Sequence, residues 1–287
     1  MKKRLLFVAR LTIAAAAMYF ASRKINWQEL KQFDWGPSLF WLVPAFVSYN
    51  ISQCTSAYRL LNYYKILRPS INYLFNLGLY YRGMLYNLFL PGGIGGDAYK
   101  IIALKTSENS YRQLTTATLL DRVTGLSTLI VIITVISMMI PRSGLLEEYF
   151  SVLPVLTLIG IPAYYIIVYY FFRPYHRIVP VSALLSVAVQ GFQFLCFYCV
   201  LSALKVETGL TLTIAFLFFT SSVIAALPLS IGGIGTRELA LATGATYFHF
   251  SPTKMVSASL VFFLLVVISS LLGWFISSFL NKRSKAL

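Results

Sequence analysis

Charged residues are scarce in this sequence, and acidic ones are the scarcest. Only 11% of the 287 residues are charged, and 9 of those are Asp or Glu, whereas 58% are hydrophobic. A soluble domain averages about 25% charged residues. Too few polar side chains are present to cover a soluble fold of this size, and several apolar runs approach the roughly 20 residues that cross a bilayer. The composition predicts an all-α integral membrane protein.

Cysteine and histidine are also rare, and neither forms a signature for metal or redox chemistry. The three cysteines, Cys54, Cys196 and Cys199, lie in apolar segments. Cys196 and Cys199 form a C-x-x-C pair without a second ligand pair nearby, which favours packing. The two histidines fall in predicted loops and form no ligand cluster. We therefore expect no metal and no other cofactor.

Basic residues far outnumber acidic ones, with 24 Lys and Arg and a formal net charge of +15. In a soluble protein this excess would suggest a nucleic-acid partner, but no nucleic-acid motif is present. In a membrane protein it is expected to set topology and to contact anionic lipid headgroups. The positive N-terminus, 173–180 loop and C-terminal tail are predicted to be cytoplasmic.

Candidate membrane spans cover residues 5–21, 38–61, 118–140, 151–172, 181–204 and 255–280. The first resembles a signal peptide, but Arg10 interrupts its apolar stretch, so we expect a retained helix, with cleavage as the alternative. Two further apolar stretches, 72–90 and 210–231, each run into a glycine motif. When the side of each loop is assigned from its charge, each stretch must leave the membrane on the same side from which it enters. They are predicted to be re-entrant hairpins that approach from opposite faces.

The two glycine motifs mark an internal duplication. They share Gly-Gly-Ile-Gly, beginning at Gly92 and at Gly232, an offset of 140 residues. The same offset relates two pairs of amide side chains: Asn50 with Gln190, and Gln53 with Gln193. We predict a single polytopic domain with about six transmembrane helices and two re-entrant hairpins, arranged as an inverted repeat of residues about 1–140 and about 141–287.

The glycine motifs are predicted to form one polar site inside the membrane. Glycine permits close backbone approach, and a half-helix behind each motif would present free N–H groups and a positive dipole end, which suit phosphate. The alternative is that the glycines only let helices pack closely, but two copies at a matching offset favour a site. The predicted substrate-binding residues are Arg82, Asn87, Gly92, Gly93, Gly95, Gly96, Asp97, Lys100, Arg122, Gly232, Gly233, Gly235, Thr236, Arg237 and Glu238.

The charged residues of the motifs allow two pairings. Asp97 and Arg237 occupy equivalent positions in the two repeats, so they pair if the hairpin tips meet. Alternatively, each motif is satisfied locally. Asp97 then pairs with Lys100. Glu238 pairs with Arg237 or accepts from a backbone N–H.

Two charged positions outside the glycine motifs are also open to interpretation. Asp121-Arg122 opens the 118–140 span and either snorkels to the interface or lines the site. Arg59 lies near the end of a predicted span and is interpreted as snorkelling.

These motifs resemble a known family. The stretch from Asn87 to Lys100, the run from Asp121 to Gly125 and the motif from Pro228 to Glu238 are similar to the membrane domain of lysylphosphatidylglycerol synthases, which also occurs alone in flippase-like proteins. The matching motif residues are Asn87, Pro91, Gly92, Gly95, Asp97, Arg122, Pro228, Gly232, Gly233, Gly235, Arg237 and Glu238. The resemblance covers nearly the whole chain. It implies a multi-pass protein of a prokaryotic cytoplasmic membrane that moves or handles a phospholipid or polyprenyl-linked lipid.

Three functions are compatible with these features. The first is a flippase-like transporter of an anionic phospholipid or polyprenyl-linked lipid, driven by gradients or equilibration because no nucleotide-binding motif is present. The second is a membrane enzyme of lipid-linked glycosyl or phosphoryl transfer, which the few acids near the motifs disfavour. The third is a membrane partner of a separately encoded lipid-modifying enzyme. Nothing here corresponds to the soluble aminoacyltransferase domain of full-length synthases, so we do not expect aminoacylation.

Overall fold

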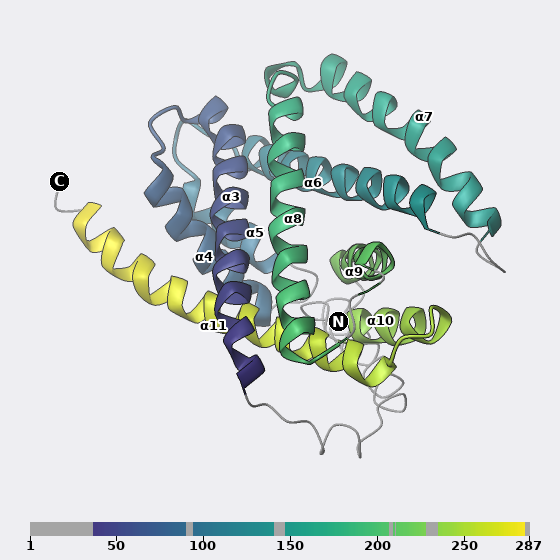
Figure 1. Ribbon diagram of the computed structural model, residues 1–287. Coiled ribbons are helices and arrows are strands. Elements are labelled where there is room, and N and C mark those ends of the chain that lie inside the picture. The colour runs from purple at the N-terminus through teal and green to yellow at the C-terminus, as the bar shows by residue number, and fades with distance from the viewer. Residues whose placement is uncertain are drawn as a thin grey trace, which may run out of the picture.

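The computed structural model describes residues 37–89, 94–140, 147–206, 209, 211–227 and 235–284, which form a helical bundle without a strand among them (Figure 1). The elements are η1 (Pro37–Trp41), α3 (Leu42–Leu67), α4 (Tyr73–Phe89), α5 (Ile94–Leu104), α6 (Tyr111–Met139), α7 (Glu147–Phe171), η4 (Arg173–Tyr175), α8 (Val179–Ala203), α9 (Thr211–Ala226), α10 (Thr236–Tyr247) and α11 (Pro252–Ser284). The all-helical prediction is confirmed for these residues. The predicted span 5–21 lies outside them.

Four helices are long and apolar enough to cross a membrane. They are α6, α7 from Val152, α8, and α11 as far as Ser277, and they coincide with four predicted spans. The predicted span 38–61 forms α3, which has 26 residues but carries many polar ones and is not among the four. Large apolar side chains on α7 are exposed, with Leu158 at 76% and Phe171 at 79%. Contiguous apolar surface of this kind requires lipid or a partner to cover it, as expected of a multi-pass membrane protein.

The helices recur at the offset of the glycine motifs. α3, α4, α5 and α6 correspond to α8, α9, α10 and α11, and each later helix begins within three residues of the position that an offset of 140 predicts. Packing recurs as well, because α4 packs on α11 while α9 packs on α6, and α3 lies along its counterpart α8 (Figure 1). Helix order and packing therefore follow the spacing that the predicted duplication implies, and the division into two repeats stays a prediction. The inverted orientation of the two halves across the membrane stays a prediction.

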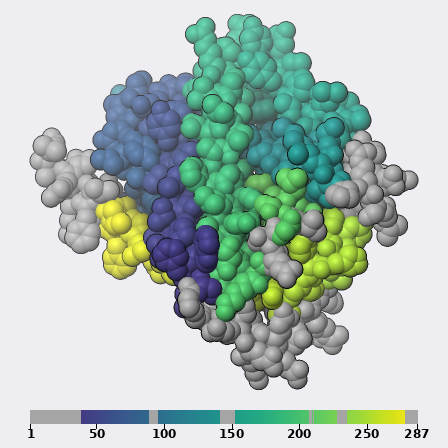
Figure 2. All heavy atoms as spheres, in the orientation of Figure 1, coloured from purple at the N-terminus to yellow at the C-terminus, as the bar shows by residue number. Residues whose placement is uncertain are grey.

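Polar side chains help to hold the centre of the bundle together. The hydroxyls of Tyr63 and Tyr64 on α3 lie 2.7 and 2.8 Å from the hydroxyls of Thr124 and Thr118 on α6. Lipid offers no partner for such groups, so they are satisfied between helices. These tyrosines of α3 are thus directed inward, and the outer sides of α3 (purple) and α8 (green) lie next to each other on the face shown in Figure 2.

The helices that follow the glycine motifs are short. α5 has 11 residues and α10 has 12. At about 1.5 Å per residue each is roughly 17 Å long, about half of a hydrocarbon core of about 30 Å. This length suits the predicted re-entrant hairpins, whose entry sides stay a prediction.

Gly96 brings the backbones of α4 and α5 into direct contact. A Cβ atom at Gly96 would lie 2.2 Å from the carbonyl oxygen of Gly83 and 2.8 Å from Oδ1 of Asn87. We expect Gly96→Ala to force the helices apart and to lower the free energy of unfolding by about 1–3 kcal/mol, as overpacking does. Thermal denaturation in detergent measures this loss. Gly160→Ala is the matched control, since no described atom lies within 4 Å of a Cβ there; equal losses in both variants would contradict the contact.

Candidate functional site

A cavity of about 500 Å³ lies where the two halves of the bundle meet. Seven helices contribute to its wall: α3, α4, α5, α6, α8, α9 and α10. The charged residues that line it are Arg59, Asp97, Lys100, Asp121, Arg122 and Arg237. Ionisable groups are expensive among apolar membrane helices, so a concentration of this kind indicates a functional site.

Asp97 holds two cations on one side of the cavity. It lies in the first turn of α5, where its Oδ1 is 2.8 Å from Nζ of Lys100, and its Oδ2 pairs with Nε of Arg122 on α6. Asp97 is 8% exposed and Lys100 is 7% exposed. The pairing is therefore the local one of the two alternatives, extended to Arg122. The ion pair between Asp97 and Arg237 across the repeats is not formed.

Arg59 and Asp121 form a second buried ion pair. Nε and Nη2 of Arg59 donate to the two carboxylate oxygens of Asp121 at 2.8 and 3.0 Å, and Nη1 donates to Oγ of Ser186 at 2.7 Å. Gly125 leaves room for the guanidinium, since a Cβ there would lie 2.8 Å from Nη1. The interpretation of Arg59 as a snorkelling residue is wrong, because its side chain joins α3, α6 and α8 inside the bundle.

Arg237 projects from the first turn of α10 into the same cavity. It also lines a smaller adjoining cavity of about 280 Å³. Its guanidinium carbon lies 5.0 Å from the ring centroid of Phe262 and 5.9 Å from that of Phe218, within cation–π range. Among the described acidic residues, none forms an ion pair with Arg237. The neighbouring Glu238 interacts with Arg237 electrostatically without forming an ion pair, and it lines the smaller cavity beside Arg237.

Glu238 fixes the start of α10 instead of neutralising Arg237. Gly235 has a φ of 84°, which favours glycine, and its N–H donates to Oε2 of Glu238 at 2.6 Å. Oε1 of Glu238 accepts from Oγ of Ser259 on α11 at 2.6 Å. Of the two predicted partners of Glu238, Arg237 and a backbone N–H, the structure shows the hydrogen bond from the backbone N–H. This buried carboxylate anchors α10 on α11 and so positions Arg237 beside it.

Two amide side chains complete the polar wall. Oδ1 of Asn87 accepts from the N–H of Gly96 at 2.7 Å and links α4 to α5. Oε1 of Gln190, on α8, is buried and has no hydrogen-bond partner within the described ranges. An unsatisfied buried acceptor is unfavourable. A guest that brings an O–H or N–H group into the cavity would satisfy it.

Thirteen of the fifteen predicted site residues divide into three groups. The cavity is lined by five of them: Asn87, Asp97, Lys100, Arg122 and Arg237. Glu238 lines the smaller adjoining cavity, and Gly95, Gly96 and Gly235 shape the beginnings of α5 and α10. Four glycines lie outside the described residues: Gly92, Gly93, Gly232 and Gly233.

Arg82 and Thr236 are the two corrections to the predicted site. Nε and Nη2 of Arg82 donate to Oγ and to the carbonyl oxygen of Ser277 at 3.1 and 3.2 Å, so Arg82 links α4 to α11. The cavity face of α4 carries Tyr80, Gly83 and Asn87, at the spacing of one helix face, and position 82 is turned away from it. Thr236 does not line the polar cavity but a separate apolar groove.

The sequence-based prediction missed Arg59 and Gln190 as residues of the site. It left Asp121 open between the interface and the site, and the structure places Asp121 in the cavity wall. A usable signal exists for Arg59. Ser52, Ser56 and Arg59 follow the i, i+4, i+7 spacing of one helix face and are all buried. A polar stripe on a membrane helix points inward, and Arg59 belongs to this stripe.

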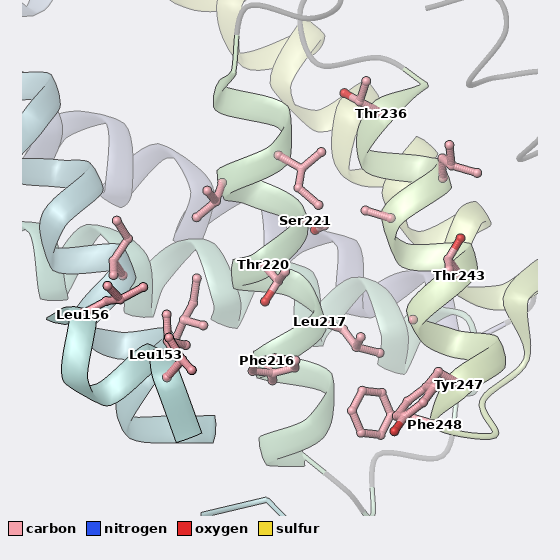
Figure 3. Close-up of a pocket in the computed structure, with 18 residues that line it drawn as sticks. Leu153, Leu156, Phe216, Leu217, Thr220, Ser221, Thr236, Thr243, Tyr247 and Phe248 are labelled. Carbon is pink, nitrogen blue, oxygen red and sulfur yellow. The ribbon is translucent and has the colours of Figure 1, made fainter. Parts of the chain in front are cut away.

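The apolar groove has a volume of about 790 Å³ and lies between α6, α7, α9 and α10 (Figure 3). Leu153 and Leu156 of α7 line it opposite Phe216 of α9. α9 forms a wall of both spaces, because Ser221 lines the groove while Ser222 lines the polar cavity. A charged cavity and an apolar groove therefore share one helix.

Comparison with known proteins places these features in a family context. A family model described as "Lysylphosphatidylglycerol synthase TM region" matches residues 7–180 and 171–273. A search of curated proteins and a search of solved structures found no match.

Proposed function

The chain belongs to the lysylphosphatidylglycerol synthase TM region family, and from this premise we propose that it carries a phosphate-bearing lipid across the membrane. The headgroup would occupy the charged cavity. The observation that carries the proposal is the combination of Lys100, Arg122 and Arg237 around one membrane-embedded space. Cations in a site of low dielectric attract a phosphate far more strongly than they do in water.

The apolar groove supports a lipid rather than a water-soluble anion. It lies directly across α9 from the charged cavity, and hydrocarbon dominates its lining. A lipid needs a polar space for its headgroup and an apolar path for its chains. The two spaces that share α9 provide both within a short distance of each other.

The duplicated architecture supports movement between two states. The cavity is built from both halves, with Asp97 and Lys100 on α5 of the first and Arg237 on α10 of the second. Relative rocking of two repeats around a shared site is the usual means of alternating access. Such rocking would expose the headgroup to each side of the membrane in turn.

Transport is favoured over catalysis by the state of the carboxylates. General acid–base chemistry needs a carboxylate that is free to exchange a proton. Asp97 and Asp121, the two described acids that line the cavity, are both engaged in ion pairs. We therefore propose that the lipid leaves the site chemically unchanged.

A reconstitution experiment tests this function. The purified chain is inserted into vesicles that contain a fluorescent phospholipid, and a membrane-impermeant quencher reports the fraction of label in the outer leaflet. We expect the label to exchange between leaflets several-fold faster than in protein-free vesicles. The lipids are then extracted and analysed by mass spectrometry, and their masses are expected to be unchanged.

Two outcomes would contradict the proposal. Exchange at the protein-free rate for every phosphate lipid tested would remove the transport function. A new lipid mass that grows with time would replace transport with lipid-linked transfer chemistry. Vesicles with heat-denatured protein control for leakage caused by insertion alone.

A further inference from the structure

We propose that the smaller cavity binds a neutral, hydroxyl-bearing group, such as the glycerol or the sugar of a lipid headgroup, while the phosphate of the same headgroup occupies the charged cavity. This inference rests on the proposed function and names the chemistry of the headgroup. It follows from the polar lining of the two cavities and from one buried amide oxygen that has no donor.

The two cavities adjoin along a common wall. The smaller one, of about 280 Å³, and the charged one, of about 500 Å³, are both lined by Tyr80, Met84, Asn87, Gln193 and Arg237. These residues belong to α4, α8 and α10. A headgroup with two parts can therefore place one part in each cavity and contact the same side chains with both.

The charged groups of the smaller cavity balance each other. Among the described residues that line it, Arg237 and Glu238 are the charged ones, and they interact electrostatically. Both carboxylate oxygens of Glu238 already accept hydrogen bonds, one from the N–H of Gly235 and one from Oγ of Ser259. A neutral polar group fits this balance, because a further buried charge would need a counter-ion of its own.

Amide and phenol groups make up the rest of the polar lining. Gln53, Asn87 and Gln193 bring amides to the smaller cavity, and Tyr49 and Tyr80 bring phenol hydroxyls. An amide side chain donates through its nitrogen and accepts through its oxygen, and a hydroxyl also does both. Several amides around one space therefore suit a ligand that carries several hydroxyls.

Gln190 indicates which kind of partner is lacking. It lies three residues before Gln193 on α8, at the spacing of one helix face, and lines the charged cavity. Its Oε1 is buried and has no donor within the described ranges. A phosphodiester brings acceptors alone and leaves this oxygen unsatisfied, which is unfavourable. A hydroxyl on the same headgroup supplies the missing donor.

An ammonium group is the alternative donor, and the surroundings of Arg237 disfavour it. The guanidinium carbon of Arg237 lies 5.0 Å from the ring centroid of Phe262, which lines the smaller cavity. The aromatic face that could hold a cation of the ligand thus already holds a cation of the protein. A second cation beside Arg237 would be repelled. A hydroxyl brings the proton without the charge.

The experiment compares three lipids that have the same short acyl chains and the same phosphodiester. Phosphatidylglycerol carries hydroxyls beyond the phosphate, phosphatidylmethanol carries a methyl group there, and phosphatidylethanolamine carries an ammonium group. The first two have equal charge, so the comparison between them reports on the hydroxyl-bearing group. Binding of each lipid to the purified chain in detergent is measured by calorimetry.

We expect phosphatidylglycerol to bind about tenfold more tightly than phosphatidylmethanol, because a donor that satisfies one buried acceptor corresponds to a factor of about ten in affinity. Phosphatidylethanolamine should bind more weakly than phosphatidylglycerol. Glycerol phosphate is the lipid-free arm, and it should also bind more weakly, because it has no chain for the apolar groove.

Gln190→Leu provides the matched variant. It removes the unpartnered oxygen, so we expect the preference for phosphatidylglycerol over phosphatidylmethanol to fall by at least about threefold. Asn62→Leu makes the same kind of change on α3, at a position that lines neither cavity, and should keep the preference. The comparison of lipids uses the parent protein, so it tests the inference even if Gln190→Leu does not fold.

The outcomes separate this inference from the proposed function. Equal binding of phosphatidylglycerol and phosphatidylmethanol by the parent protein, or tighter binding of phosphatidylethanolamine, would overturn the hydroxyl assignment, while exchange of these lipids in vesicles would leave transport standing. A preference that survives unchanged in Gln190→Leu would contradict the role of its amide. Glycerol phosphate that binds as tightly as phosphatidylglycerol would overturn the assignment to a lipid. If no phosphate lipid binds or moves, the proposed function fails as well.

Discussion

Replacing Asp121 by Asn is expected to lower the free energy of unfolding by about 3–5 kcal/mol, the cost of removing one partner of a buried ion pair. Arg59 is 8% exposed and Asp121 is 5% exposed. The guanidinium of Arg59 stays charged in this variant, because arginine does not lose its proton in proteins. The amide that replaces the carboxylate offers one uncharged acceptor oxygen in place of two charged ones, so Arg59 keeps hydrogen bonds to that oxygen and to Ser186 but loses its counter-ion. The penalty is that of an unpaired buried cation.

The loss is measured by denaturant titration of the purified protein in mixed micelles. Glu108→Gln is the matched control, since it removes an acid from an exposed position and should change stability by less than about 0.5 kcal/mol. A double variant, Arg59→Met with Asp121→Leu, replaces both charges by apolar groups and should recover most of the stability. If Asp121→Asn unfolds at the same denaturant concentration as the parent, the pair does not hold α3 to α6.

Helix positions and their spacing along the chain could be predicted from the sequence because both depend on local patterns. Apolar runs of membrane length predicted the four candidate spans. The offset between the glycine motifs predicted which helices correspond, since a duplicated segment keeps its internal spacing. The pair between Asp97 and Lys100 is also local, because residues three apart share a helix face.

The remainder of the site depends on how helices are rotated against one another, which local patterns do not determine. Arg59 and Asp121 are 62 residues apart and meet only because α3 and α6 turn their polar faces toward each other. Arg82 shows the opposite case. It precedes a glycine motif, as expected of a site residue, yet the rotation of α4 directs it to Ser277 on α11. Proximity to a motif in sequence does not decide which side of a helix faces the cavity.

Replacing Arg237 by Gln is expected to slow lipid exchange between leaflets at least tenfold while leaving the fold intact. Two unit charges about 4 Å apart attract by about 4 kcal/mol at an effective dielectric constant of 20, and each 1.4 kcal/mol is a factor of about ten in affinity. Desolvation of the phosphate offsets part of this attraction, so the rate of lipid exchange is expected to fall roughly ten- to a hundredfold. The vesicle exchange assay measures this rate. Arg112→Gln is the control, because Arg112 is an exposed cation outside the cavity.

The contrast between the two substitutions is the sharper test, because each removes one charge from the same cavity wall. Asp121 neutralises a buried cation, so its loss should appear as instability. Arg237 forms no ion pair with a described carboxylate. Its removal forfeits cation–π contacts with Phe218 and Phe262, worth about 0.5–2 kcal/mol, and the electrostatic interaction with Glu238, whose carboxylate keeps its hydrogen bonds from Gly235 and Ser259. Arg237→Lys keeps the charge and should retain part of the exchange rate. A stable Arg237→Gln protein that exchanges lipid at the parent rate would show that the charge of α10 does not act on the ligand.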